Sequence, residues 1–196
     1  MSKFKMSLIK EYGLEASSED DGEGERNLNP LAEAMLVMKM ARTDGSPAFI
    51  YGHEGLAIGS IGCAYNEQAL VNAGITHILT LTKLSRLKFP EIFIYKRVPM
   101  RDSMEQTITD VLAECFEFID NALASPNGKV LVHCYKGISR CATVCVAYLM
   151  SRHGMSSDDA LALIRHTRPQ ACPNIHFIIS LRLLEKSNTT EVETLN

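Results

Sequence analysis

Short apolar runs alternate along the chain with longer segments whose apolar residues have helical spacing. The apolar runs are rich in β-branched and aromatic residues and are bounded by glycine, proline or asparagine, as buried strands are. We therefore predict two short strands within residues 46–60, broken at Gly52, and further strands within residues 76–82, 91–100 and 129–134.

Between and after these runs, apolar residues recur at intervals of three and four, which predicts helices packed on a core. In one such segment Ile108, Val111, Leu112 and Cys115 would share a helix face. The predicted helices span residues 66–72, 104–124, 140–153, 157–166 and 174–185. This alternation predicts an α/β fold with a central, mostly parallel sheet flanked by helices.

The first part of the chain has a different composition. Residues 11–26 contain seven acids and one base and few apolar residues, so we predict an acidic, disordered segment over residues 1–28. Residues 29–45 contain LAEAMLVMKMAR, which predicts an N-terminal helix or linker. The folded domain is expected over residues 46–187, followed by a C-terminal tail over residues 188–196.

Composition and cysteine usage narrow the class of protein. The chain has 196 residues, 46% of them apolar, and no apolar run long enough to span a bilayer, so we expect no membrane insertion. Its six cysteines form no Cys-x-x-Cys pair and suggest no disulfide framework. With no secretory signal, a location in the cytoplasm, or the nucleus, is expected. Cys172 and His176 are spaced like half a zinc site, but no second pair accompanies them.

The segment VLVHCYKGISRCATVCVAYLM carries the candidate chemistry. It predicts a buried strand, a tight loop and a helix that begins near Arg140, an arrangement that points backbone N–H groups at one spot. Gly137 permits the turn, and the positive potential of the loop would hold Cys134 as a thiolate. Arg140 could bind two oxygens of a phosphate at once. The phosphate-binding residues would be Tyr135, Lys136, Gly137, Ile138, Ser139 and Arg140.

This segment resembles the signature of the cysteine-dependent protein tyrosine phosphatases, and AYLM after it resembles their dual-specificity branch. The signature residues are His133, Cys134, Gly137, Ser139 and Arg140. The similarity extends from GLAIGS and GITHILTLT through YKRVPMRD to RPQACPNIHF. It implies a three-layer fold and a phosphatase that works through a phosphocysteine, with no metal and no cofactor.

The resemblance also implies a general acid upstream of the cysteine, and Asp102 fits its place after YKRVPMR. The alternative role for Asp102 is to cap the following helix, whereas Glu105 and Asp110 are less suitable acids. His133, Ser139 and Asn174 are expected to support the loop. Cys141 stands where the family usually has Ser or Thr, and a thiol is a weaker hydrogen-bond donor than a hydroxyl. We therefore predict slow breakdown of the phosphocysteine.

The short connection between residues 82 and 102 leaves no room for a deep phosphotyrosine pocket. By family analogy, phosphoserine and phosphothreonine should be accepted along with phosphotyrosine. Alternatives are a phosphoinositide or RNA 5′ phosphate as substrate, or a non-catalytic module that binds phosphoproteins; a sulfurtransferase or arsenate reductase fits less well. The expected partners are a phosphorylated protein and a protein kinase, which Lys3, Lys5, Leu8 and Ile9 could dock, but no nucleic acid.

Overall fold

The computed structural model describes residues 30–83 and 87–193. A five-stranded sheet forms its centre, in the order β1-β2-β5-β3-β4. The edge strand β1 runs antiparallel to β2, and the other neighbours are parallel, as predicted. The strands are β1 (Ala48–Ile50), β2 (His53–Gly59), β3 (His77–Thr80), β4 (Ile94–Arg97) and β5 (Val130–His133).

The carboxyl ends of the three central strands meet at one edge of the sheet. His133 at the end of β5 is in register with Gly59 of β2 on one side and with Thr80 of β3 on the other. The chain segments that leave these strands are therefore side by side, which is where ligands bind in open α/β sheets.

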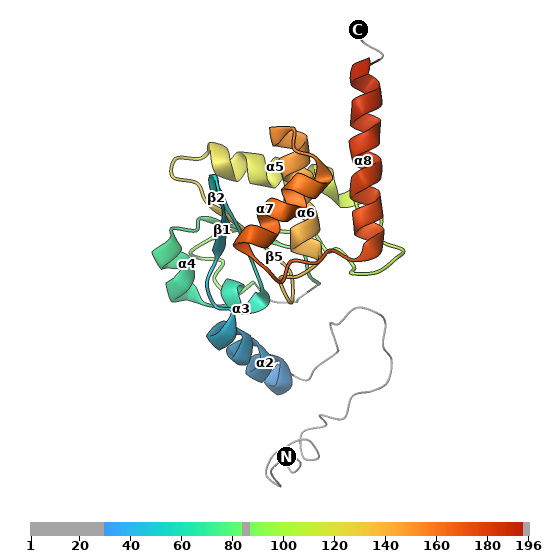
Figure 1. Ribbon diagram of the computed structural model, residues 1–196. Helices are drawn as coiled ribbons and strands as arrows, with labels where there is room; N and C mark the ends of the chain where they lie inside the picture. The colour runs from blue at the N-terminus through green and yellow to red at the C-terminus, as the bar shows by residue number, and fades with distance from the viewer. Residues whose placement is uncertain (1–29, 84–86, 194–196) are drawn as a thin grey trace.

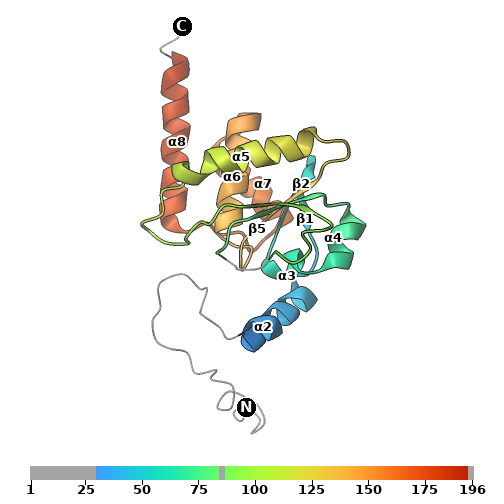
Figure 2. The same ribbon diagram turned by 180° about the vertical axis from the view of Figure 1, so that it is seen from behind.

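Helices cover both faces of the sheet, which confirms the predicted three-layer arrangement (Figures 1 and 2). Val130 and Val132 of β5 face a core formed with α5, α6, α7 and α8, whereas Leu131 faces a smaller core with α3 and α4. Side chains alternate across a strand, so a strand buried on both faces is apolar throughout. The helices are α3 (Ile61–Ala64), α4 (Glu67–Ala73), α5 (Thr109–Ala124), α6 (Arg140–His153), α7 (Ser157–Thr167) and α8 (Ile175–Glu193).

Most element ends follow from local chemistry. The Asn66 side chain accepts a hydrogen bond from the Ala69 amide and so caps α4, which ends at Gly74 with a φ of 72°. The helix predicted from residue 104 begins only at Thr109. Before it, the Gln106 side chain accepts from the Arg101 amide and donates to the Thr107 carbonyl, which stabilises a loop instead.

Three further features differ from the prediction or lie beyond it. The four-residue helix α3 was not predicted, because it is shorter than a periodic pattern can reveal. The last helix, α8, continues past the predicted end at Glu185 to Glu193. The predicted acidic segment and the kinase-docking pattern lie outside the described residues. No helix in the described ranges is long and apolar enough to cross a bilayer.

Helix α2 (Pro30–Thr43) lies outside the three layers, next to α3 (Figure 1). Its Val37 is buried and forms a small apolar cluster with Ile61 of α3 and Tyr135, a residue of the loop after β5. The helix approaches closely because Gly62 has no side chain: a Cβ there would come within 2.4 Å of the Met40 carbonyl carbon. The N-terminal helix is thus packed on the domain.

The sheet provides a matched pair of core and surface sites. Ile58 of β2 is fully buried, whereas Ile94 of the edge strand β4 is 59% exposed. We expect Ile58→Ala to lower the free energy of unfolding by about 2–5 kcal/mol because it leaves a cavity. Ile94→Ala should cost less than about 1 kcal/mol. Urea unfolding of both variants measures the difference, and equal costs would contradict this picture of the core.

Candidate active site

The loop of residues 134–139 joins the buried end of β5 to the first residue of α6. The Gly137 backbone has a φ of 68°, in the left-handed region that favours glycine. A Cβ at this position would lie 2.8 Å from the Gly59 carbonyl and 2.4 Å from a guanidinium nitrogen of Arg168. Both the backbone conformation and the space therefore require glycine here. The positive end of α6 points at the loop.

Cys134 lies at the start of this 134–139 loop, and its side chain is 2% exposed. The Gly137 amide donates a hydrogen bond to its sulfur at 3.2 Å, and the Cys141 sulfur lies 3.4 Å away. The hydrogen bond from the Cys141 thiol is the main reason that the pKa of Cys134 is lowered to about 6. The Arg140 charge and the Gly137 amide lower this pKa further, whereas burial acts to raise it. Cys134 is therefore mostly a thiolate at neutral pH.

Burial, the largest influence on the pKa of other cysteines in the chain, has the opposite effect. It raises the pKa of Cys63 and of Cys115 to about 12. Burial and the neighbouring Cys134 sulfur also raise the pKa of Cys141 well above its ordinary value. Cys141 is therefore the donor in the pair, and its S–H group donates to the Cys134 thiolate.

His133 is buried just before the loop and has a partner on each ring nitrogen. Nδ1 lies 3.2 Å from the Cys134 carbonyl oxygen, and Nε2 lies 2.9 Å from Oγ1 of Thr80. Because a carbonyl only accepts, Nδ1 carries the hydrogen and Nε2 accepts from the Thr80 hydroxyl. Burial lowers the pKa of His133 to about 4. This neutral histidine orients the backbone of Cys134, which fits a supporting role.

Asp102, in the segment after β4, is held against the same loop. Its Oδ1 accepts from the Ser139 hydroxyl at 2.7 Å and from the Asn174 side-chain amide at 2.8 Å. The Asn174 backbone amide in turn donates to the Ser139 hydroxyl. Asp102 does not cap α5, whose N-cap position is Ile108.

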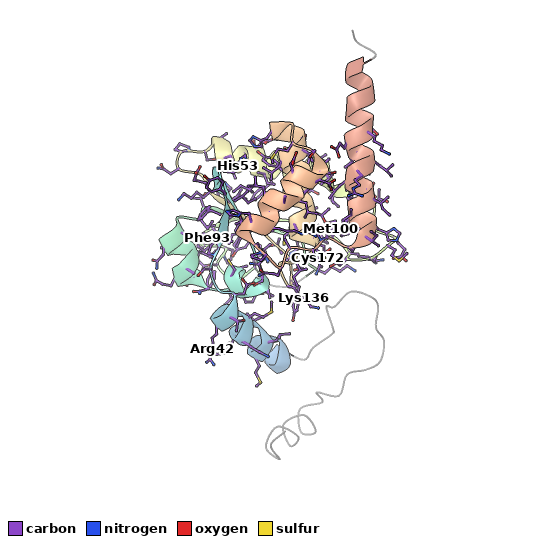
Figure 3. The ribbon with its side chains drawn as sticks, viewed as in Figure 1. Arg42, His53, Phe93, Met100, Lys136 and Cys172 are labelled. Atoms are coloured by element: carbon purple, nitrogen blue, oxygen red, sulfur yellow. The ribbon has the colours of Figure 1, made fainter. Side chains whose placement is uncertain are left out.

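Arg140 and most of the other predicted residues gather around one open pocket, whose lining does not include Gly137, His133 or Cys141. Arg140 is 5% exposed, and one of its terminal nitrogens donates to the Met100 carbonyl at 3.2 Å. Lys136 and Cys172, labelled in Figure 3, are the exposed members of the set. The pocket has a volume of about 360 Å³ and is lined by Asp102, Cys134, Tyr135, Lys136, Ile138, Ser139, Arg140, Cys172 and Asn174.

The structure adds residues to this site that the sequence analysis did not identify. Arg168 is 3% exposed, and its Nε donates to the Gly137 carbonyl at 2.5 Å. It belongs to the RPQACPNIHF stretch, but nothing in its local pattern distinguishes it from a surface arginine. Thr80, the partner of His133, lies inside a predicted strand, and its local pattern likewise does not indicate a role at the site. Cys172 and His176 belong to no group of three metal-binding side chains among the described residues.

Comparison with known proteins places the chain in a family. A family model described as dual specificity phosphatase, catalytic domain, matches residues 56–187. Dual specificity protein phosphatase 1 of Arabidopsis thaliana is 40% identical over 166 residues, which cover 83% of this chain and 82% of that protein. Dual specificity protein phosphatase 1B of the same species is 44% identical over 134 residues, or 68% of this chain and 80% of that one.

The fold agrees with this assignment. The solved structure of a mouse dual specificity phosphatase complexed with zinc tungstate is 29% identical to this chain, with a TM-score of 0.69. The alignment covers 76% of this chain and 91% of the mouse chain. The resemblance predicted from the sequence is thereby confirmed, and the chain belongs to the dual specificity phosphatases.

Proposed function

We propose that this chain hydrolyses phosphate esters of phosphoproteins, on tyrosine as well as serine and threonine, through a phosphocysteine on Cys134. The observation that carries the proposal is that a buried cysteine sulfur and a guanidinium line one open pocket. Cys134, with a pKa of about 6, and Arg140 line the same pocket. A tetrahedral dianion there would meet the loop amides and the Arg140 fork directly above a nucleophile.

In the first step the Cys134 sulfur attacks phosphorus, an S–P bond forms and the bond to the leaving oxygen breaks. Asp102 donates its proton to that oxygen, whose negative charge grows in the transition state. We assign the transferable proton to Oδ2, because Oδ1 already accepts from Ser139 and Asn174. In the second step Asp102 takes a proton from water, which attacks phosphorus and releases phosphate and the thiolate.

Cys141 acts in the second step as well, because its S–H group donates to the sulfur that must leave. The two sulfurs are 3.4 Å apart. A thiol donates more weakly than the hydroxyl that the family usually has in this place, so it assists the departing thiolate less. Slow breakdown of the phosphocysteine is the expected consequence.

The pocket supports protein substrates over the alternatives. It is open, so it can take short phosphoserine as well as long phosphotyrosine side chains, and Lys136 and Arg140 are the cations that line it. A phosphoinositide or an RNA 5′ end would favour more positive charge. Retention of Cys134, Arg140 and Asp102 around one pocket favours an enzyme over a binding module. The mouse relative was solved with tungstate, a tetrahedral oxyanion like phosphate.

Two finer proposals concern partner and location. A protein kinase as partner rests on the basic and apolar pattern of Lys3, Lys5, Leu8 and Ile9. A cytoplasmic or nuclear location rests on cysteine chemistry: all six cysteines are free, and the nucleophile needs a reducing compartment.

A substrate panel tests the proposed reaction. We expect the protein to release phosphate from phosphotyrosine, phosphoserine and phosphothreonine peptides faster than from phosphoinositides or RNA 5′ ends. Cys134→Ser should abolish turnover, and Asp102→Ala should lower kcat on phosphopeptides by about 10²–10⁴-fold. The loss in Asp102→Ala should be smaller on an aryl phosphate, whose leaving group needs no proton. Turnover that survives in Cys134→Ser would contradict the mechanism.

The ionisation of Cys134 gives a pH prediction. Its thiolate should be lost as the pH falls through about 6, so its rate of alkylation by iodoacetamide should have its midpoint there. In Cys141→Ala the first cause of the lowered pKa is removed, and the midpoint should rise toward the ordinary value of 9.0. Cys145→Ala, which removes a neighbouring buried thiol, is the control and should leave the midpoint near 6.

The thiol of Cys141 gives a kinetic prediction. In Cys141→Ser a stronger donor faces the departing sulfur, so breakdown of the phosphocysteine should be faster while its formation changes little. Rapid-quench measurements of the burst and the steady state separate the two steps. An unchanged rate of the second step would show that Cys141 does not limit hydrolysis.

A further inference from the structure

An ion pair joins the end of α2 to the segment that follows α7. Arg168, directly after α7, donates through Nη1 to Oδ1 of Asp44 at 2.9 Å and through Nη2 to Oδ2 at 2.5 Å. The Arg168 side chain is 3% exposed and that of Asp44 is 24% exposed. Asp44 is the first residue after α2, so this bidentate pair ties the N-terminal helix to the segment that follows α7.

The same guanidinium holds the 134–139 loop. Besides the bond to the Gly137 carbonyl, Nη2 of Arg168 donates to the Lys136 carbonyl at 3.3 Å. That carbonyl belongs to the same peptide group as the Gly137 amide, which donates to the Cys134 sulfur. In a planar trans peptide the C=O and N–H bonds point in opposite directions. By holding the carbonyl, Arg168 aims the amide at the sulfur.

Asp44 is placed by contacts that do not involve Arg168, among them a hydrogen bond from its amide to the Met40 carbonyl of α2 at 2.7 Å. The Ser60 hydroxyl donates to the Asp44 carbonyl at 3.2 Å, and the Asn66 side chain donates to the Gly45 carbonyl at 3.0 Å. Val37 also belongs to one apolar cluster with Ile61 of α3 and Tyr135 of the loop itself. The helix therefore reaches the loop by an apolar contact as well as through the ion pair.

The pairing is required on electrostatic grounds. A guanidinium with so little exposure cannot be left uncompensated, because the cost of burying a lone charge is large. Asp44 supplies the opposite charge and, through two parallel hydrogen bonds, the orientation of the fork. Without Asp44 the Arg168 side chain would have to reorient toward other acceptors and would release the two loop carbonyls.

We propose that Asp44 and Arg168 are positioning residues of the phosphate site. Helix α2, which precedes Asp44, thereby contributes to phosphate binding. Both Asp44 and α2 precede residue 56, where the match to the family model begins. The inference rests on the proposed function, since it concerns the loop assigned to phosphate binding. It adds that the N-terminal helix sets the direction of the loop amide.

Two near-isosteric variants of the full chain test the proposal. Asp44→Asn removes the charge and one acceptor, and Arg168→Lys keeps the charge but loses the fork. In both we expect inorganic phosphate to protect Cys134 from iodoacetamide about 10- to 100-fold less well, with kcat/KM lowered to match. The pH midpoint of Cys134 alkylation should rise in both.

The signs of these effects separate positioning from simple electrostatics. If Asp44 acted only through its charge, the Asp44→Asn protein would bind phosphate more tightly than the wild type. Its pH midpoint of Cys134 alkylation would then be lower. Unchanged or tighter phosphate protection in Asp44→Asn, or wild-type behaviour of Arg168→Lys, would overturn the proposal. Because alkylation needs no turnover, this readout fails or succeeds independently of the phosphatase assays.

Asp120→Asn is the matched control. Asp120 of α5 pairs with Arg152 of α6: two nitrogens of the guanidinium donate to Oδ2, with the shorter contact at 2.8 Å. Its loss should affect thermal stability but neither phosphate protection nor the midpoint. If Asp44→Asn or Arg168→Lys fails to fold by circular dichroism, Val37→Ala loosens the helix through its apolar contact instead. That variant should weaken phosphate protection in the same direction, and unchanged protection would count against the proposal.

Discussion

An ionised sulfur with almost no exposure to water is the constraint on which the rest of this structure depends. Burial penalises a thiolate, as the pKa of about 12 for Cys63 shows. Cys134 is just as buried, yet its pKa is about 6 because the Cys141 thiol, the Arg140 charge and the Gly137 amide surround it. A strand that ends at the nucleophile and a helix that begins six residues later bring these donors together.

Keeping those donors aimed at one atom requires support from distant parts of the chain. The loop carbonyls point away from the sulfur and need donors of their own, which His133 and Arg168 supply. Arg168 then needs a counter-charge, which Asp44 supplies from beyond α2. Each layer of support satisfies a polar group that the previous layer left buried. The order of the 134–139 loop therefore depends on the hydrogen bonds from His133 and Arg168 and on the ion pair with Asp44.

The sequence predicted what local pattern and spacing control. The alternation of elements, the helix that follows Asn66 and the start of α6 at Arg140 follow from periodicity and neighbouring residues. Most of the residues that line the pocket follow from one motif and one acid, but Cys172, which also lines it, was not predicted as a site residue. Arg168 and Asp44 could not be found in this way, since 124 residues separate them and neither belongs to a periodic pattern. The late start of α5 depends on side-chain bonds of Gln106 that propensity does not reveal.

The pKa of Cys134 also explains why stronger hydrogen-bond donors around its sulfur would bring little advantage. At pH 7 a thiol with a pKa of about 6 has ~10 thiolates for every protonated sulfur, so further lowering would add little reactive form. Each lower unit would make the thiolate a weaker nucleophile, because nucleophilicity falls with basicity. It would, however, make the sulfur a better leaving group. A weak donor such as Cys141 therefore favours attack on phosphorus over release of the phosphate, and a hydroxyl in its place shifts the balance toward release.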